Sequence, residues 1–395
     1  MTKSNSMELG ELPAVAVPGL YVHVPFCFHK CHYCDFYSIT RQSAERMERF
    51  VELILREAEG WAGSARGPDV RLKTVFIGGG TPSLLPVAAM ARLLRGLRER
   101  FECAAVDEWT VECNPATVSP DYCAMLREHG VDRLSFGAQS FEEGELKVLE
   151  RHHAPADVAR TMEIARAAGF RRVNVDLIYA IPGQSMENWQ RTLAVAVALQ
   201  TEHISAYNLT YEANTPIAVK KRLGTITPVD ERTELEMLHE ARRTLAAAGY
   251  AAYEISNYAR PGEECRHNLL YWNGGSYIGL GPSAASHVEG HRWKNRAHLG
   301  EWEAAVESGA LALAEVEHLS LEQRAGELVM LQLRLAGGVG FEQFRAKLGL
   351  DARELYGQIL NRLEEAGLIV VNEEGFALSE SGINMADGVA GEFLA

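Results

Sequence analysis

Residues 23–37, HVPFCFHKCHYCDFY, bring three cysteines close together: Cys27, Cys31 and Cys34. The spacing C-x3-C-x2-C lets three thiolates hold one iron–sulfur cube, a 4Fe-4S cluster, whose fourth iron keeps no protein ligand. Thiolates also suit zinc and copper(I). A structural zinc site wants four ligands, and no second cysteine pair follows. The alternative to a cluster is therefore a partial zinc knuckle with His29 or His32 as the fourth ligand.

The composition predicts a cytoplasmic protein. The 395 residues are 47% hydrophobic, enough for one large domain and a smaller one. Seven cysteines, three of them clustered, do not form the pattern of a secreted disulfide framework. We find no signal-peptide organisation and no run of about 18 apolar residues, while peripheral contact with the inner face of the membrane stays open. The net charge of −14 argues against nucleic acid as a partner.

Strand-like runs alternate with amphipathic helices over the first three quarters of the chain. The predicted strands are 21–24, 74–80, 108–114, 133–140, 172–179 and 203–209. The predicted helices are 45–60, 87–102, 121–129, 157–168, 186–199 and 231–248. Repeated β-then-α units indicate a parallel sheet, and six of them predict a full or partial β/α barrel. Chemistry in such folds collects at the carboxyl ends of the strands, where this chain carries polar or glycine-rich residues.

Three parts of the chain are expected: an N-terminal tail (1–17), the barrel with an extension (18–305) and a C-terminal domain (306–395). The last part contains helices at 319–335, 341–348 and 352–366, and then a β-hairpin within 367–382. This order resembles a small winged-helix-like α+β domain. Because the chain is acidic, a packing or lid role is favoured over contact with DNA.

The segment VFIGGGTPSLL (75–85) places three glycines directly after a predicted strand. Glycines allow a backbone to approach a ligand closely, although an ordinary tight turn would have the same composition. The segment matches neither a Walker loop nor G-x-G-x-x-G. The segment becomes informative about function because the three-cysteine motif precedes it in the same chain.

Together these motifs resemble the radical S-adenosylmethionine (SAM) superfamily. YVHVPFC, GGGTPSLL, VECNP, RLSFGAQSF, DLIYAIPGQ, YEISNYA and HNLLYW resemble more narrowly its oxygen-independent coproporphyrinogen III oxidase-like group, from about residue 19 to the C-terminus. The resemblance implies a partial (β/α)6 barrel, a 4Fe-4S cluster ligated by the three cysteines, and SAM bound to the open iron. One departure is Ala180, where the group usually has glycine.

The resemblance also implies a set of residues around SAM: Tyr21, Phe36, Gly79, Gly80, Thr81, Glu112, Gln139, Arg151 and Asp176. Tyr21 would lie beside SAM, and the glycines with Thr81 would line its methionine part. Glu112 would meet the amino group. Gln139 and Asp176 would bind the ribose hydroxyls, and Arg151 the carboxylate, which agrees with the acceptors and cation that such a ligand needs. Alternatively, Arg151 is a solvated surface residue, and Gln139 and Asp176 are local turn or cap residues.

Two features favour the heme-chaperone branch of this group. The oxidase branch carries a further cysteine where this chain has Phe36, and the chaperone branch is marked by H-N-x-x-Y-W, here His267, Asn268, Tyr271 and Trp272. Imidazole is a good axial ligand to heme iron, and aromatic rings can pack on a porphyrin. The simpler alternative is that these four residues stitch a loop to the barrel.

We therefore expect a protein that binds heme, with His267 on the heme iron, and passes it to an acceptor protein. A respiratory, membrane-associated acceptor and a homodimer are compatible with this expectation. The rival hypothesis is a radical enzyme of the coproporphyrinogen III oxidase type. Such an enzyme would oxidatively decarboxylate the propionates of a porphyrinogen, and the cofactor would supply the chemistry.

Overall fold

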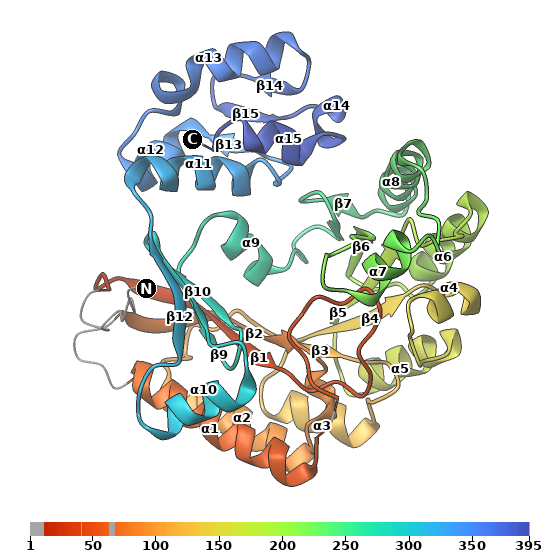
Figure 1. The fold of residues 1–395 in the computed structure, drawn as a ribbon, viewed down its shortest axis with the longest axis vertical. Coiled ribbons are helices and arrows are strands. Elements are labelled where there is room, and N and C mark those ends of the chain that lie inside the picture. Colours follow the sequence, from red (N-terminus) through yellow and green to blue (C-terminus); the bar gives the residue numbers. More distant parts are fainter. Residues whose placement is uncertain (1–11, 41, 63–67, 395) are drawn as a thin grey trace.

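Six parallel strands form the centre of the molecule. The computed structural model describes residues 12–40, 42–62 and 68–394, so most of the predicted tail lies outside the described residues. The strands are β1 (Ala16–Val24), β2 (Asp69–Gly79), β3 (Glu108–Cys113), β4 (Arg133–Gln139), β5 (Arg172–Tyr179) and β6 (His203–Asn208). They pair in sequence order, and each pair is parallel. The predicted partial (β/α)6 barrel is thereby confirmed (Figure 1).

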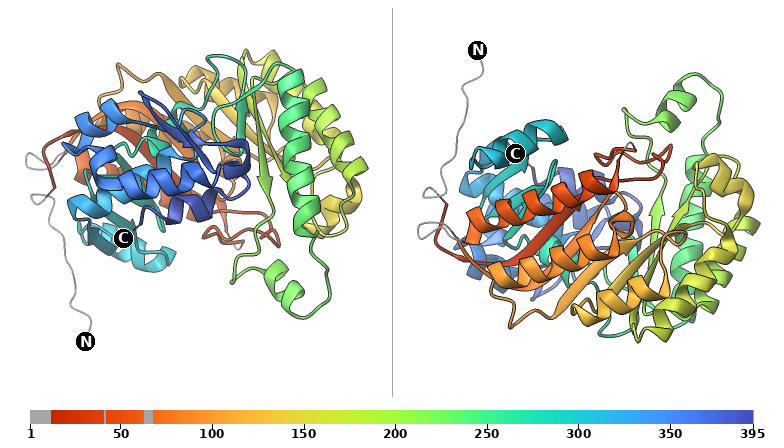
Figure 2. Two further views of the ribbon diagram at one scale, coloured as in Figure 1. Left: turned by 90° about the horizontal axis from the view of Figure 1, so that it is seen from above. Right: turned by 90° about the horizontal axis from the view of Figure 1, so that it is seen from below.

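Amphipathic helices cover the outer face of these strands (Figure 2). They are α1 (Ala44–Ala62), α2 (Val87–Arg100), α3 (Pro120–Glu128), α4 (Glu143–Val148), α5 (Pro155–Ala167), α6 (Met186–Ala198) and α8 (Glu231–Ala247). Helix α7 (Pro216–Arg222) instead projects from the barrel (Figure 2), and the N–H of its Ile217 donates to the His32 carbonyl. Side-chain oxygens of Ser119, Ser185 and Asp230 cap the starts of α3, α6 and α8. Helix α1 is an example of the amphipathic pattern, because its apolar residues Phe50, Ile54 and Trp61 lie on one buried face.

The inner face of the barrel is polar. Side chains alternate along a strand, so Glu108, Thr110 and Glu112 of β3 share one face. On β5, the amide of Asn174 donates to Ser135 Oγ at 2.7 Å and to Asp176 Oδ1 at 2.8 Å. The interior of the barrel is therefore lined by hydrogen-bonded polar groups rather than packed with apolar side chains. Such an interior is suited to a polar ligand.

Short strands lengthen both edges of the sheet, and the sequence analysis did not predict them. On one side lie β9 (Tyr277–Leu280), β10 (Ala285–Val288), β11 (His291–Asn295) and β12 (Leu313–His318); on the other lie β8 (Asn257–Ala259) and β7 (Ala251–Ala252). Strand β9 is parallel to β1, and the strands beyond it are antiparallel. Helices α9 (Arg266–Trp272) and α10 (Leu299–Glu307) belong to this extension. The domain boundary between residues 305 and 306 remains a prediction. Strand β12 lies on the C-terminal side of this boundary but pairs with β11 in the large sheet.

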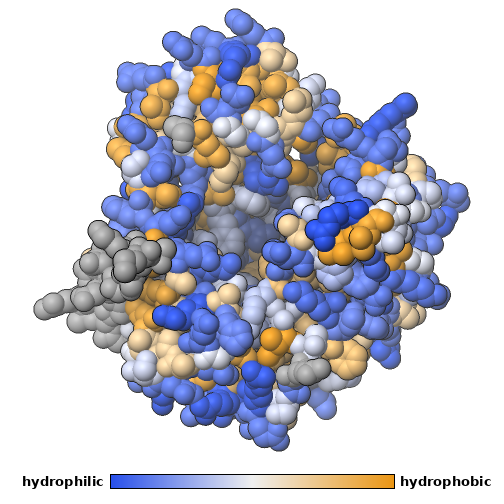
Figure 3. Space-filling view, in the orientation of Figure 1, coloured by the Kyte–Doolittle hydropathy of each residue, from blue (hydrophilic) through white to orange (hydrophobic). Residues whose placement is uncertain are grey.

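The C-terminal unit has its own hydrophobic core, which includes Phe344, Tyr356, Phe376 and Phe393. It contains α11 (Leu321–Gln332), β13 (Val339–Gly340), α12 (Phe341–Leu348), α13 (Ala352–Glu365), β14 (Ile369–Val371), β15 (Gly375–Leu378), α14 (Glu380–Ile383) and α15 (Ala386–Gly391). The predicted helices, here α11 to α13, and a small antiparallel sheet confirm the predicted small α+β domain, to which α14 and α15 are added. Figure 3 shows a hollow between this unit and the barrel. In the described part of the chain, no helix is long and apolar enough to cross a bilayer.

Candidate functional site

The three cysteines lie on the loop that follows β1. Among the described residues, their thiols form no disulfide, and Thr81 Oγ1 donates to Cys27 Sγ at 3.7 Å. One zinc ion with bonds of about 2.3 Å would hold its sulfurs about 3.8 Å apart. The one group of described His, Cys, Asp and Glu side chains that converges in this way excludes the cysteines. In a cube, by contrast, each thiolate binds a different iron. The choice of a cluster over the zinc knuckle remains a prediction.

Arg151 lies against the cysteine loop rather than on the solvated surface. Its Nη1 is 3.7 Å from Cys31 Sγ, and its Nη2 donates to the Gly137 carbonyl at 2.5 Å. Its Nε is shielded from solvent and has no hydrogen-bond partner among the described residues. A buried cationic donor without an acceptor is suited to an anionic ligand, such as the predicted carboxylate.

The glycine segment is tied to the start of the cysteine loop. Gly79 has a φ of +102°, and its N–H donates to Glu112 Oε2 at 3.0 Å. A Cβ on Gly80 would come within 2.8 Å of the carbonyl oxygens of Val24 and Phe26. Glycine is therefore required at both positions, at the first by the backbone conformation and at the second by the approach of the chain's own backbone.

Two carboxyl groups, Glu112 and Asp176, face the interior near this segment. Burial, together with the charge of the nearby Asp176, raises the pKa of Glu112 to about 7. Burial also raises the pKa of Asp176, against hydrogen bonds from Asn174, Ser205 and Ser135. Two acids that repel each other in a half-buried space are stabilised by a cation between them.

Gln139 and Ala180 each adopt a left-handed backbone conformation, with φ of +65° and +60°. The register between β4 and β5 shifts between Gly137 and Gln139, so a bulge redirects the Gln139 side chain at the end of its strand. At Ala180 the positive φ explains why glycine is usual there. The replacement of glycine is therefore a matter of backbone conformation rather than of side-chain size.

Two residues that the sequence analysis did not select support the site. His23 accepts a hydrogen bond from the Tyr21 hydroxyl at 3.0 Å through Nδ1, while its Nε2 faces the Tyr37 carbonyl at 2.8 Å. Glu108 has no exposed surface and accepts from the backbone N–H groups of Arg266 and His267, both at 3.0 Å. The period of two along β3, which puts Glu108 on the same face as Glu112, is the signal that could have found it.

Helix α9, which carries the predicted heme motif, is packed against the inside of the barrel. His267 is 1% exposed and stacks on Phe76. Its Nδ1 is hydrogen-bonded to Thr74 Oγ1 at 2.9 Å and its Nε2 to the Tyr271 hydroxyl at 2.8 Å. Burial lowers the pKa of His267 to about 4, which keeps the imidazole neutral. In this conformation His267 holds α9 against β2 through Thr74 and Phe76.

The other end of α9 meets the C-terminal unit. The guanidinium of Arg334 lies 5.1 Å from the centre of the Trp272 ring, and Lys347 Nζ donates to the Gly274 carbonyl at 2.7 Å. Asn268 is half-buried between the two ends. A pocket of about 340 Å³ adjoins the helix, with Tyr271, Tyr277, His287, Arg292, Glu327 and Leu331 in its wall. Tyr271 thus touches His267 on one side and the pocket on the other.

The predicted site residues fall into two groups. The cysteine loop, Arg151 and the glycine segment are brought together by direct contacts. The motif of α9 is a second group, joined to the barrel through Thr74 and Phe76. Phe36 is 64% exposed on the cysteine loop, as is Phe28 at 75%.

Comparison with known proteins agrees with this arrangement. Family models match the radical SAM superfamily over residues 21–196 and the HemN C-terminal domain over residues 319–384. The heme chaperone HemW of Mycobacterium tuberculosis is 36% identical over 97% of this chain and 98% of its own length. HemW of Bacillus subtilis is 32% identical over 95% and 98%, and HemW of Escherichia coli is 41% identical over 68% and 70%.

Among solved structures, coproporphyrinogen III oxidase (HemN) from Escherichia coli superposes with a TM-score of 0.84 over 98% of this chain and 92% of that chain. At 23% identity, this likeness establishes the fold alone. The matches in sequence to HemW proteins span nearly the whole chain, and they establish the family as well as the fold. The chain belongs to the HemW family of heme chaperones, within the radical SAM superfamily.

Proposed function

We propose that the protein binds heme and passes it to an acceptor protein. The observation that carries this proposal is the match to proteins named heme chaperone HemW, 36% identical over 97% of the chain. The aromatic side chain of Phe36, where the oxidase branch has a cysteine, supports the same choice. A membrane-associated respiratory acceptor and a homodimer remain parts of the proposal.

The residues present fit the two cofactors that the superfamily implies. Cys27, Cys31 and Cys34 would hold a 4Fe-4S cluster, which together with SAM supplies one-electron chemistry when bound. Arg151, with its unpartnered buried Nε, would bind the SAM carboxylate. Glu112 would hold the amino group, and Asp176 with Gln139 the ribose. Tyr21, whose hydroxyl is hydrogen-bonded to His23, would lie beside the bound SAM.

Binding of SAM should strengthen as the pH rises through about 7. Glu112 must be ionised to pair with an ammonium group, and its pKa in the ligand-free protein is about 7. The ionised fraction rises about tenfold between pH 6 and pH 8, and the affinity should rise with it. Equilibrium dialysis of SAM at several pH values measures the effect. In Glu112→Gln the affinity for SAM should be weak and nearly constant over this pH range. If the affinity of this variant rose with pH as steeply as that of the wild type, a group other than Glu112 would be responsible for the pH dependence.

For heme, we propose His267 Nε2 as the axial ligand. This nitrogen is bonded to the Tyr271 hydroxyl at 2.8 Å, so ligation requires Tyr271 to move away. The pocket beside Tyr271 supports such a movement, since about 340 Å³ lies next to the ring. The neutral state of His267 is the form that binds a metal.

Tyr271→Phe should tighten heme binding, because it frees Nε2 without removing the ring. A hydrogen bond contributes about 1 kcal/mol, so the expected gain is roughly fivefold in affinity. His267→Ala should weaken binding and shift the heme absorption spectrum. Hemin titrations followed by absorbance compare both variants with wild type. If both variants bind exactly as wild type does, the ligand lies outside α9.

The function itself is tested with a porphyrinogen. The cluster-loaded protein is incubated anaerobically with SAM, a reductant and coproporphyrinogen III, and decarboxylated product and 5′-deoxyadenosine are measured. We expect neither to depend on the porphyrinogen. Catalytic turnover of the porphyrinogen would replace the chaperone proposal with the oxidase hypothesis.

A further inference from the structure

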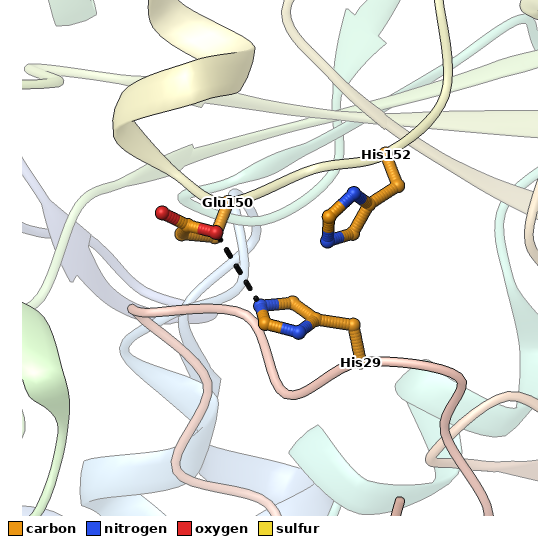
Figure 4. Close-up of side chains that lie close together, drawn as sticks. All are labelled: His29, Glu150 and His152. Carbon is orange, nitrogen blue, oxygen red and sulfur yellow. Dashed lines mark ion pairs between the residues drawn. The ribbon is translucent and has the colours of Figure 1, made fainter.

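A second group of potential metal ligands lies outside the predicted cluster and heme sites. It consists of His29, Glu150 and His152 (Figure 4). His29 belongs to the cysteine loop, while Glu150 and His152 belong to the segment between α4 and α5. One ligand atom from each residue lies within 4.8 Å of the other two. Two segments that are far apart in the sequence therefore meet at three side chains with metal-binding atoms.

The separations suit one bound ion. His29 Nε2 lies 3.6 Å from Glu150 Oε2, too far for a hydrogen bond. The rings of His29 and His152 are nearly perpendicular, with their centres 4.6 Å apart. An ion with bonds of about 2.0–2.2 Å keeps its ligand atoms about 3.0–4.2 Å apart, so small adjustments would complete the site.

His29 Nε2 provides an independent sign of a missing partner. This atom is shielded from solvent and has no hydrogen-bond partner among the described residues. A cation bound beside it would give this nitrogen the partner that it lacks. Glu150, which faces it, has a φ of +56°, an unusual conformation for a glutamate.

We propose that His29, Glu150 and His152 bind a divalent transition-metal ion, of the class of Zn²⁺, Co²⁺ or Fe²⁺. Two imidazoles and one carboxylate favour these ions over Mg²⁺ and Ca²⁺, which prefer oxygen ligands. His152 is exposed and His29 is half-buried, so an ion reaches the site from solvent and keeps open coordination positions. Bound there, the ion joins the cysteine loop to the segment that carries Arg151, whose Nη1 lies 3.7 Å from Cys31 Sγ.

The test uses Co²⁺ with the cluster-loaded protein under anaerobic conditions. Equilibrium dialysis followed by metal analysis measures bound cobalt and retained iron together. We expect one cobalt per chain with no loss of iron. His152→Ala and Glu150→Gln, both outside the cysteine loop, should weaken cobalt binding at least tenfold while the iron content stays at the wild-type level. His298→Ala, which removes an exposed histidine far from this loop in the sequence, is the matched control and should bind as wild type does.

The same samples separate this site from the cysteines. The cluster itself absorbs strongly in the visible and near ultraviolet, so each spectrum is taken as the difference from the cobalt-free, cluster-loaded protein. In this difference, cobalt on imidazole and carboxylate shows weak visible bands, whereas cobalt on thiolates adds strong sulfur-to-metal charge-transfer bands in the near ultraviolet. Three results would each overturn the proposal. They are cobalt binding that shows the charge-transfer bands, cobalt binding accompanied by loss of iron, and cobalt binding that is unchanged in His152→Ala. The absence of stoichiometric binding to the wild-type protein would overturn it as well.

Discussion

Replacing any one of Cys27, Cys31 and Cys34 with alanine should remove nearly all cluster iron from the anaerobically reconstituted protein. The chain offers the cube three thiolates from one loop, and no spare cysteine follows at position 36. Losing one of three leaves two irons without a protein ligand, which exposes the cluster to solvent and to loss of iron. Iron and sulfide analysis, together with the brown absorbance of the cluster, measures the effect.

Cys103→Ala is the matched control for this experiment. Cys103 is a half-buried free thiol distant in sequence from the loop, and its replacement should leave the iron content unchanged. If one of the three loop variants kept a full complement of cluster iron, the ligand assignment would be wrong. A loss that also occurred in the control would point to general instability of the protein.

Glu108→Ala should lower the free energy of unfolding by about 3–5 kcal/mol, as expected when one partner of a buried ion pair is removed. The Glu108 carboxylate lies 2.7 Å from Arg172 Nη2, and it also accepts hydrogen bonds from two backbone N–H groups at the start of α9. Its replacement leaves these two buried N–H groups without their acceptor, and it removes one of the three carboxylates around Arg172, which keeps Asp132 and Glu263. Urea unfolding followed by circular dichroism measures the change.

The control for this prediction is Glu236→Ala, which removes an exposed partner of Arg232 within α8. Exposed pairs of this kind contribute about 0.3–0.5 kcal/mol, so this variant should unfold almost as wild type does. Because α9 carries His267, Glu108→Ala should also impair heme binding. Equal stability of the two glutamate variants would mean that Glu108 does not hold α9 in place.

The sequence predicts the regular part of this fold well. Strands β1 to β6 and the long helices follow hydrophobic periodicities that local residues determine, and most of their ends fall within a few residues of the predicted ones. Strands β9 to β12 were missed because they are only four to six residues long and owe their conformation to pairing at the sheet edge. Periodicity carries little signal over such lengths.

The site is predicted by motif rather than by geometry. The spacing of the cysteines brings them onto one loop, but it does not show that His29 turns toward Glu150 and His152, more than a hundred residues later. Likewise, the pattern H-N-x-x-Y-W marks a family branch without showing that His267 is bonded to Thr74, 193 residues earlier. Contacts across such separations depend on the whole fold, which local patterns do not specify.

A hemin titration of the cluster-loaded wild-type protein beside His267→Ala tests heme handling most directly. We predict saturation at one heme per chain for the wild type, and weaker binding with a shifted Soret band for the variant. The absence of saturable heme binding by the wild-type protein would contradict the proposed function.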